Sequence, residues 1–256
     1  MDLGLEGKIA IVTGVASEQG IGRAVALALA GEGCGIACID IDKKGAEEAA
    51  HRIIATGKKA VALECDQSDY TSVKEAVAMV NERMGGVDIL INNAAWMNNV
   101  DLIRTMPVAH WDKEVSVNLS GPFYFIKEAL PIMMRRKWGR IINISSLLGL
   151  MGVGGRVGYC SAKSGLIGLT KTAAIEGARG NVTANLLFFG MVDTAGSRAT
   201  VPQQQWDVIV QRGALQRAAT IEEVANIVAF YASEKSAFIT GAEVMVDGGQ
   251  TLLVLG

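Results

Sequence analysis

The chain of 256 residues has no long apolar run, although half of it is hydrophobic. No uninterrupted apolar stretch approaches the ~20 residues that a helix needs to cross a bilayer, so we predict no membrane span. The N-terminus, residues 1–6, is acidic and lacks the basic, then apolar, then small-residue order of a signal peptide. We therefore expect a soluble cytoplasmic protein.

Clustered charge and clustered metal ligands are also missing. The formal net charge is -2 and the basic residues are scattered, which argues against a nucleic-acid partner. The cysteines have no Cys-x-x-Cys spacing and the histidines lie in separate helical stretches, so we expect buried reduced thiols and no metal site. These residues are Cys34, Cys38, Cys65, Cys160, His51 and His110.

Short apolar runs alternate with amphipathic helical stretches, and no linker rich in proline or serine interrupts them. Such strands are typical of a parallel sheet covered by helices on both faces. We predict an α/β fold: a doubly wound Rossmann domain over residues 1–256, with its ligand beyond the carboxyl ends of the strands. About seven strands are expected, at 8–13, 35–40, 60–65, 87–91, 140–145, 181–188 and 243–246.

A tyrosine and a lysine four residues apart give the clearest chemical signal. In the run Tyr-Cys-Ser-Ala-Lys, Tyr159 and Lys163 share one face of a helix. The lysine charge can stabilise a phenolate and bring the tyrosine closer to a usable proton donor or acceptor. This pair predicts carbonyl and alcohol chemistry, although the same spacing also occurs on ordinary solvated helix faces.

Two polar residues upstream favour the catalytic interpretation. The apolar run 139–146 has the pattern of a buried strand that ends in two hydroxyls, and Ser146 lies thirteen residues before Tyr159. Asn118 places a carboxamide inside a helical stretch, where asparagine is unfavourable because it competes for main-chain hydrogen bonds. Together with Lys163, these residues form a candidate catalytic set.

In order and spacing, the polar and glycine motifs resemble those of the short-chain dehydrogenase/reductase family. The resemblance extends over residues 8–249. The matching motifs are Thr13-Gly14 with Gly20-Ile21-Gly22, Asp40, Asp66, Asn92-Asn93-Ala94-Ala95, Asn118, Ser145-Ser146, Tyr159 with Lys163, Asn185, Gly190 with Thr194, and Ile239-Thr240-Gly241 leading to Val246-Asp247-Gly248-Gly249.

The resemblance implies a role for each member of the catalytic set. Tyr159 would exchange a proton with the oxygen of a small-molecule alcohol or ketone while hydride passes between the substrate carbon and nicotinamide. Ser146 would hold the same oxygen. Lys163 would bind the nicotinamide ribose and lower the tyrosine pKa, and Asn118 would hold a relay water through its main chain.

The loop after the first predicted strand indicates a dinucleotide site. Gly14 permits a tight turn, and Gly20 lets the next helix approach a pyrophosphate. Asp40, at the end of the second strand, would accept hydrogen bonds from the adenosine ribose and repel a 2′-phosphate, which favours NAD over NADP. By resemblance, Asp66 contacts adenine and Asn92 holds the main chain beside the cofactor. The other expected contacts are Ser17, Gln19, Ile21, Gln67, Ala94, Tyr159, Lys163, and Val192 with Thr194 at the nicotinamide carboxamide.

Two departures from the family pattern leave an alternative open. Most members have three residues between the first two motif glycines, whereas this chain has five, at 15–19. Phe189 stands where the family has proline, which would fix the main chain beside nicotinamide. We expect a reshaped phosphate site and a packing substitution, with impaired cofactor binding or altered activity as the alternative.

Substrate choice should depend on the variable segments 96–100, 147–158 and 192–217. Trp96, Met97 and Met151 suggest an apolar pocket, although such residues also pack in ordinary cores. A hydroxyacyl-CoA or a cyclic alcohol would suit this pocket. Four arginines are candidates for a substrate carboxylate or phosphate, and each also fits a solvated surface: Arg156, Arg198, Arg212 and Arg217.

Apolar side chains on the expected helical stretches 101–119 and 122–136 predict an oligomer, with residues 251–255 as part of a second interface. The side chains in question are Phe123, Phe125, Ile126, Leu130 and Met133. A homo-tetramer is expected, and a mixed oligomer with a homologous chain is the alternative.

Three functions remain open: an active NAD-dependent dehydrogenase, a non-catalytic subunit that stabilises an active homologous partner, and a cofactor-sensing regulator. The complete catalytic set favours the first.

Overall fold

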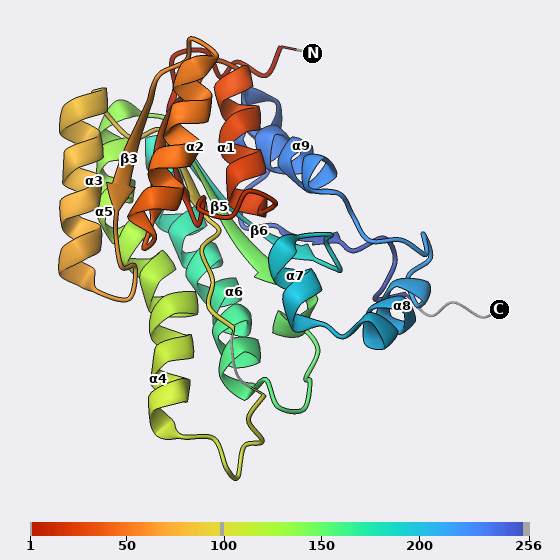
Figure 1. The fold of residues 1–256 in the computed structure, drawn as a ribbon. Helices are drawn as coiled ribbons and strands as arrows, with labels where there is room; N and C mark the ends of the chain where they lie inside the picture. The colour runs from red at the N-terminus through yellow and green to blue at the C-terminus, as the bar shows by residue number, and fades with distance from the viewer. Residues whose placement is uncertain (1, 98–99, 253–256) are drawn as a thin grey trace.

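The sheet has seven strands, and all neighbouring strands are parallel (Figure 1). The structure is a computed structural model, and it describes residues 2–97 and 100–252. The strand order, β3-β2-β1-β4-β5-β6-β7, reverses direction between β1 and β4. The predicted doubly wound fold is therefore confirmed, with strand ends within two residues of those expected. The strands are β1 Ile9–Thr13, β2 Gly35–Asp40, β3 Ala60–Glu64, β4 Ile89–Asn92, β5 Gly139–Ser146, β6 Val182–Phe189 and β7 Glu243–Val246.

Helices cover both faces of the sheet (Figure 1). One face carries α1 (Ile21–Gly31), α2 (Lys43–Ala55) and α9 (Ile221–Ala232). The other carries α3 (Tyr70–Met84), α5 (Gly121–Arg136) and α6 (Val157–Gly177). The other α-helices and a π-helical turn lie toward the carboxyl ends of the strands: α4 Val108–Val115, the turn Ser116–Ser120, α7 Ala195–Thr200 and α8 Gln203–Gln211. Short 3₁₀ turns occupy Leu147–Gly149, Ala178–Gly180 and Glu234–Ser236.

The first strand shows why the sequence requires two helical layers. All five residues of β1 are buried, because successive side chains point to opposite faces and both faces are covered. Ala10 and Val12 pack in the core beneath α1 and α9, whereas Ile9 and Ile11 pack in the core beneath α3 and α5. An alternating polar residue in this strand would enter one of the two cores.

Two helical predictions need correction. Residues 101–107 are not helical, and α4 begins only after Pro107, which has an extended ψ of 137° as the N-cap. Of the five apolar residues proposed for an interface, only Phe123 is exposed. The other four are buried in the core between α5 and the sheet, so they are not available for an interface: Phe125, Ile126, Leu130 and Met133.

The predicted C-terminal interface and the absence of a membrane span concern the remaining parts of the chain. Residues 253–255 of the predicted C-terminal interface lie outside the described residues, and Leu252 is exposed. Across residues 2–97 and 100–252, the helices are all too short or too polar for a membrane span.

Candidate active site

A pocket of about 470 Å³ lies beyond the carboxyl ends of β1, β2 and β4, where the strand order reverses. Gln19 is exposed beside it, and Asn92 and Val192 are buried outside its walls. Predicted cofactor residues that line it are Gly14, Ser17, Gly20, Ile21, Asp40, Asp66, Gln67, Ala94 and Thr194.

The long loop between β1 and α1 is held by contacts along its length. The N–H of Ala16 donates to Asp40 Oδ2 at 2.8 Å. Arg23 is buried, and its guanidinium donates to the carbonyl oxygens of Val15 at 3.0 Å and Gly45 at 2.9 Å. At the far end, the N–H of Ala195 donates to the carbonyl oxygen of Gln19 at 3.2 Å. The five-residue spacer is thus an ordered loop that reaches from β2 to α7.

The loop delivers glycine to the start of α1. Gly20 is the N-cap, and no side chain caps the helix, so its first N–H groups are available to an anion. A Cβ on Gly22 would lie 2.1 Å from the carbonyl oxygen of Gly14, so only glycine permits this approach of helix and loop. These features fit a bound pyrophosphate.

Asn93 holds the main chain beside the pocket, a role that the sequence interpretation gave to Asn92. Its Nδ2 donates to the carbonyl oxygens of Thr13 at 2.8 Å and Gly14 at 3.2 Å. Asn92 points into the sheet core instead and donates to Asn143 Oδ1 at 2.8 Å. The two side chains diverge because consecutive residues at a strand end face opposite sides.

Three other predicted cofactor residues have protein partners. Asp66 Oδ1 accepts from the main chain and the hydroxyl of Ser68, and these bonds help to lower the Asp66 pKa despite partial burial. Gln67 Nε2 donates to the carbonyl oxygens of Ala94 and Val117, so this side chain braces the pocket wall. Asp40 Oδ1 accepts from the N–H of Asp42 at 3.1 Å, and the Asp40 carboxylate still lines the pocket.

Three of the predicted catalytic residues meet between the end of β5 and the first turns of α6. Ser146 ends β5, and its hydroxyl lies close enough to the Tyr159 phenol to lower the pKa of that group. Lys163 is one helical turn further along α6, with Nζ 5.7 Å from the centroid of the Tyr159 ring. Its Nζ donates to the carbonyl oxygen of Ile144 at 2.8 Å.

Burial controls both titrating groups. Burial raises the pKa of Tyr159 to about 12, against the lowering effect of the nearby Ser146 hydroxyl. Burial lowers the pKa of Lys163 to about 8. That Lys163 lowers the tyrosine pKa stays a prediction, because the Lys163 ammonium donates to Ile144 in this structure and desolvation of the phenolate dominates the Tyr159 pKa.

Asn118 lies in the π-helical turn, next to this cluster, and is fully buried. Its Oδ1 accepts from the N–H of Trp96 at 3.0 Å, and its Nδ2 donates to the Trp96 carbonyl oxygen at 2.7 Å. The carboxamide therefore fixes the start of the variable segment 96–100. A π-helical turn departs from the α-helical hydrogen-bond pattern and is frequent at functional sites.

Phe189 is buried and packs in the core beneath α1 and α9. It is paired with Ser146 in the sheet register, but it does not line the cofactor pocket. The interpretation of Phe189 as a packing residue agrees with this position.

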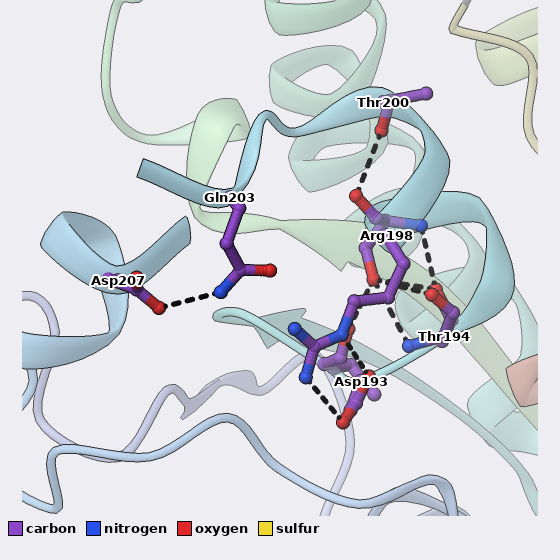
Figure 2. A network of polar contacts seen from close by, with 8 residues as sticks. Asp193, Thr194, Arg198, Thr200, Gln203 and Asp207 are labelled. Atoms are coloured by element: carbon purple, nitrogen blue, oxygen red, sulfur yellow. Dashed lines mark hydrogen bonds and ion pairs between the residues drawn. The ribbon is translucent and has the colours of Figure 1, made fainter. Parts of the chain in front are cut away.

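Thr194 is the N-cap of α7, and its side chain caps that helix. Thr194 Oγ1 accepts from the N–H of Ser197 at 3.0 Å, and Figure 2 shows Thr194 beside Asp193 and Arg198. Arg198 donates to both carboxylate oxygens of Asp193, at 2.7 and 2.9 Å, and stacks on Trp206. Two of the arginines proposed to bind substrate therefore already pair with carboxylates: Arg198 with Asp193, and Arg217 with Glu223.

Comparison with known proteins decides the family. A family model described as Enoyl-(Acyl carrier protein) reductase matches residues 14–251. The chain is 36% identical over 251 residues to the 3-oxoacyl-[acyl-carrier-protein] reductase FabG of Escherichia coli, covering 98% of this chain and all of that protein. The corresponding reductase of Thermotoga maritima is 34% identical over 245 residues, covering 96% and 98%.

Solved structures agree. A short-chain type dehydrogenase/reductase from Mycobacterium marinum superposes with a TM-score of 0.92 at 27% identity, covering 98% of each chain. The chain belongs to the short-chain dehydrogenase/reductase family. Members of this family are oxidoreductases that transfer hydride to or from a nicotinamide cofactor.

The sequence interpretation missed several residues of this dehydrogenase/reductase site. Arg23 follows the glycine motif directly, and a charged residue within the apolar pattern of α1 was the available signal. Glu114 gave a similar signal, because it occupies a buried position of α4 that the helical pattern assigns to an apolar residue. Asn93 could not be distinguished from Asn92 without the geometry of the strand end.

The buried lysine predicts a pH-dependent difference in stability between wild type and Lys163→Met. The Lys163 pKa is about 8 in the folded protein and 10.5 ordinarily, so between these values the unfolded chain binds the extra proton. The free energy of unfolding of wild type, relative to the variant, should rise from about pH 8 to about pH 10 by on the order of 2–3 kcal/mol. Urea denaturation of both proteins across this range measures the difference, and a difference that stays constant would contradict the burial of a charged lysine.

Proposed function

We propose that this chain is an NAD-dependent enzyme that interconverts a secondary alcohol and a ketone, with Tyr159 as the proton donor and acceptor. The observation that carries the proposal is the proximity of the Tyr159 and Ser146 side chains, with Lys163 one turn away, at the same edge of the sheet as the dinucleotide pocket. A hydroxyl and a phenol that converge on one point can hold and protonate a single substrate oxygen.

Residues of the pocket fit a dinucleotide that lacks a 2′-phosphate. The uncapped start of α1 suits the pyrophosphate, and the Asp40 carboxylate suits a ribose diol. When bound, the nicotinamide supplies the hydride donor or acceptor.

The remaining chemistry belongs to the protein. In ketone reduction, the Tyr159 phenol donates its proton to the oxygen as charge develops there, and the Ser146 hydroxyl donates a hydrogen bond to the same oxygen. In alcohol oxidation, the proton returns to the Tyr159 phenolate. The Lys163 ammonium lies close enough to favour that phenolate once its contact with Ile144 is exchanged for one on the cofactor side.

An apolar acyl thioester is the substrate class that the surroundings support best. Leu102, Ile103 and Val153 line a pocket of about 340 Å³ beside the start of α6, and Leu150 and Met151 are exposed nearby. The curated relatives from Escherichia coli and Thermotoga maritima are named as 3-oxoacyl-[acyl-carrier-protein] reductases. We propose a 3-oxoacyl thioester and its 3-hydroxyacyl counterpart as the substrate pair.

Replacing the tyrosine tests the reaction. Tyr159→Phe should retain NADH binding within a few-fold, while kcat for reduction of a 3-oxoacyl thioester falls by roughly 10²–10⁴, the contribution typical of general acid catalysis. Calorimetry with NADH and stopped-flow absorbance measure the two quantities. Near-normal turnover by the variant would exclude Tyr159 as the acid. No NADH binding by wild type would instead favour a non-catalytic subunit.

Replacing the strand-end carboxylate tests the cofactor. Asp40→Asn should retain the acceptor for the Ala16 N–H but lose the charge, so the preference for NADH over NADPH should fall by about 10–100-fold. Asp40→Ala should also weaken NADH, because the loop loses its anchor. Dissociation constants of both cofactors for the three proteins provide the comparison. A wild-type preference for NADPH would refute the assignment.

A homo-tetramer remains our proposal for the assembly. It is supported by exposed apolar side chains on α4 and α5, among them Val108, Trp111 and Phe123. The buried apolar residues of α5 belong to the core and do not support an interface. Light scattering of the purified chain should give four times the mass of one chain, and a stable monomer at micromolar concentration would exclude the proposal.

A further inference from the structure

Glu114 is a buried carboxyl group with no part in the reaction as described so far. It lies on α4 and is 2% exposed, and its Oε2 is buried without a hydrogen-bond partner. Burial raises the pKa of Glu114, and the nearby main-chain N–H of Tyr159 opposes that increase. A carboxyl group is costly to bury, so its contact with the catalytic helix calls for a function.

The contact is made at the N-terminus of α6. Arg156 is the N-cap of this helix, and its side chain provides no cap hydrogen bond. Tyr159 is the third residue of the helix, so its N–H has no acceptor within the helix. The Glu114 carboxyl group lies against this turn from α4, close enough for the Tyr159 N–H to lower the Glu114 pKa, and its negative charge suits the positive end of the helix dipole.

Gly158 makes room for the carboxyl group. A Cβ at this position would lie 2.3 Å from Glu114 Oε2 and 3.1 Å from Glu114 Cβ. The glycine just before the catalytic tyrosine is therefore explained by Glu114. On the opposite side, the Glu114 carbonyl oxygen accepts from Asn118 Nδ2 at 2.9 Å, so the same residue links the Asn118 turn to the catalytic helix.

We propose that Glu114 is a positioning residue for Tyr159. It caps α6 from outside the helix, fixes the first turn against α4, and places a negative charge that disfavours the tyrosinate. This inference rests on the proposed function, because it takes Tyr159 to be the reacting acid and base.

The sign of the electrostatic effect follows from the groups around the pair. Asp101 precedes α4, His110 lies on α4, and Arg156 precedes α6; all three act on Glu114. Tyr159 is influenced in turn by Arg156, which lowers its pKa, and by Cys160 and Glu114, which raise it. Lys163 lies within 5.7 Å of the ring. Removing the Glu114 charge should therefore lower the pKa of Tyr159.

Two substitutions separate the charge from the cap. Glu114→Gln retains an oxygen for the Tyr159 N–H and removes the charge, whereas Glu114→Leu removes both. Asp112→Asn, at an exposed position of the same helix, removes a charge without touching α6 and is the matched control. The readouts are the pH profile of kcat/KM for alcohol oxidation and amide hydrogen exchange of the segment 157–163.

The expected results differ for each variant. Glu114→Gln should move the rising limb of the profile to lower pH by about half a unit or more and leave amide exchange nearly unchanged. Glu114→Leu should accelerate exchange of the first turn of α6 about tenfold or more, consistent with loss of a cap, and lower kcat more than it raises KM. Asp112→Asn should change neither quantity.

Two outcomes would overturn the inference. One is an unshifted pH limb in Glu114→Gln, and the other is equal exchange in Glu114→Leu and wild type. Hydrogen exchange does not require turnover. If wild type proved inactive, the proposed function would fail, while the exchange data would still decide whether Glu114 caps the helix.

Discussion

Parallel pairing of β1 with β4, where the strand order reverses, is the constraint on which the site depends. The pairing sets the ends of neighbouring strands at one edge, so Thr13, Asp40 and Asn93 meet although they are far apart in the chain. The next strand, β5, ends in Ser146 at the same edge. A displaced register would separate the cofactor residues from the catalytic residues without altering either motif.

Polar groups in buried places maintain this edge. Arg23 holds the long loop, Asn93 holds the first motif glycine, and Asn118 holds Trp96. Each uses a side-chain donor to satisfy main-chain carbonyl groups that no strand or helix pairs, which is the usual condition for burying polar groups. In our proposal Glu114 does the converse and accepts from a main-chain donor at the start of α6. The irregular segments of the site are therefore ordered by side chains from regular elements.

Much of the fold and part of the site could be predicted from the sequence. Apolar runs located all seven strands, because buried parallel strands leave little room for polar residues. The convergence of Ser146, Tyr159 and Lys163 followed from spacing along one strand and one helix.

The failures have physical causes. The apolar pattern of α5 could not reveal how deeply Phe125 and Met133 are buried. The predicted helix 101–119 started too early, because α4 begins only after Pro107. Spacing along the helix could not predict the rise of the Tyr159 pKa to about 12, because desolvation depends on tertiary packing. The pairing of Arg198 with Asp193 could not be predicted, because it depends on the conformation of the segment that joins them (Figure 2).

Direct hydride transfer beside Tyr159 is the central claim, and isotopic labelling tests it most directly. Purified protein would be incubated in ordinary water with NADH deuterated at nicotinamide C4 on either face, together with a 3-oxoacyl thioester, and the product analysed by mass spectrometry. With one of the two labelled cofactors, the 3-hydroxyacyl product should carry a single deuterium on C3. Product without deuterium from both cofactors, or no product from a range of ketones despite NADH binding, would contradict the account.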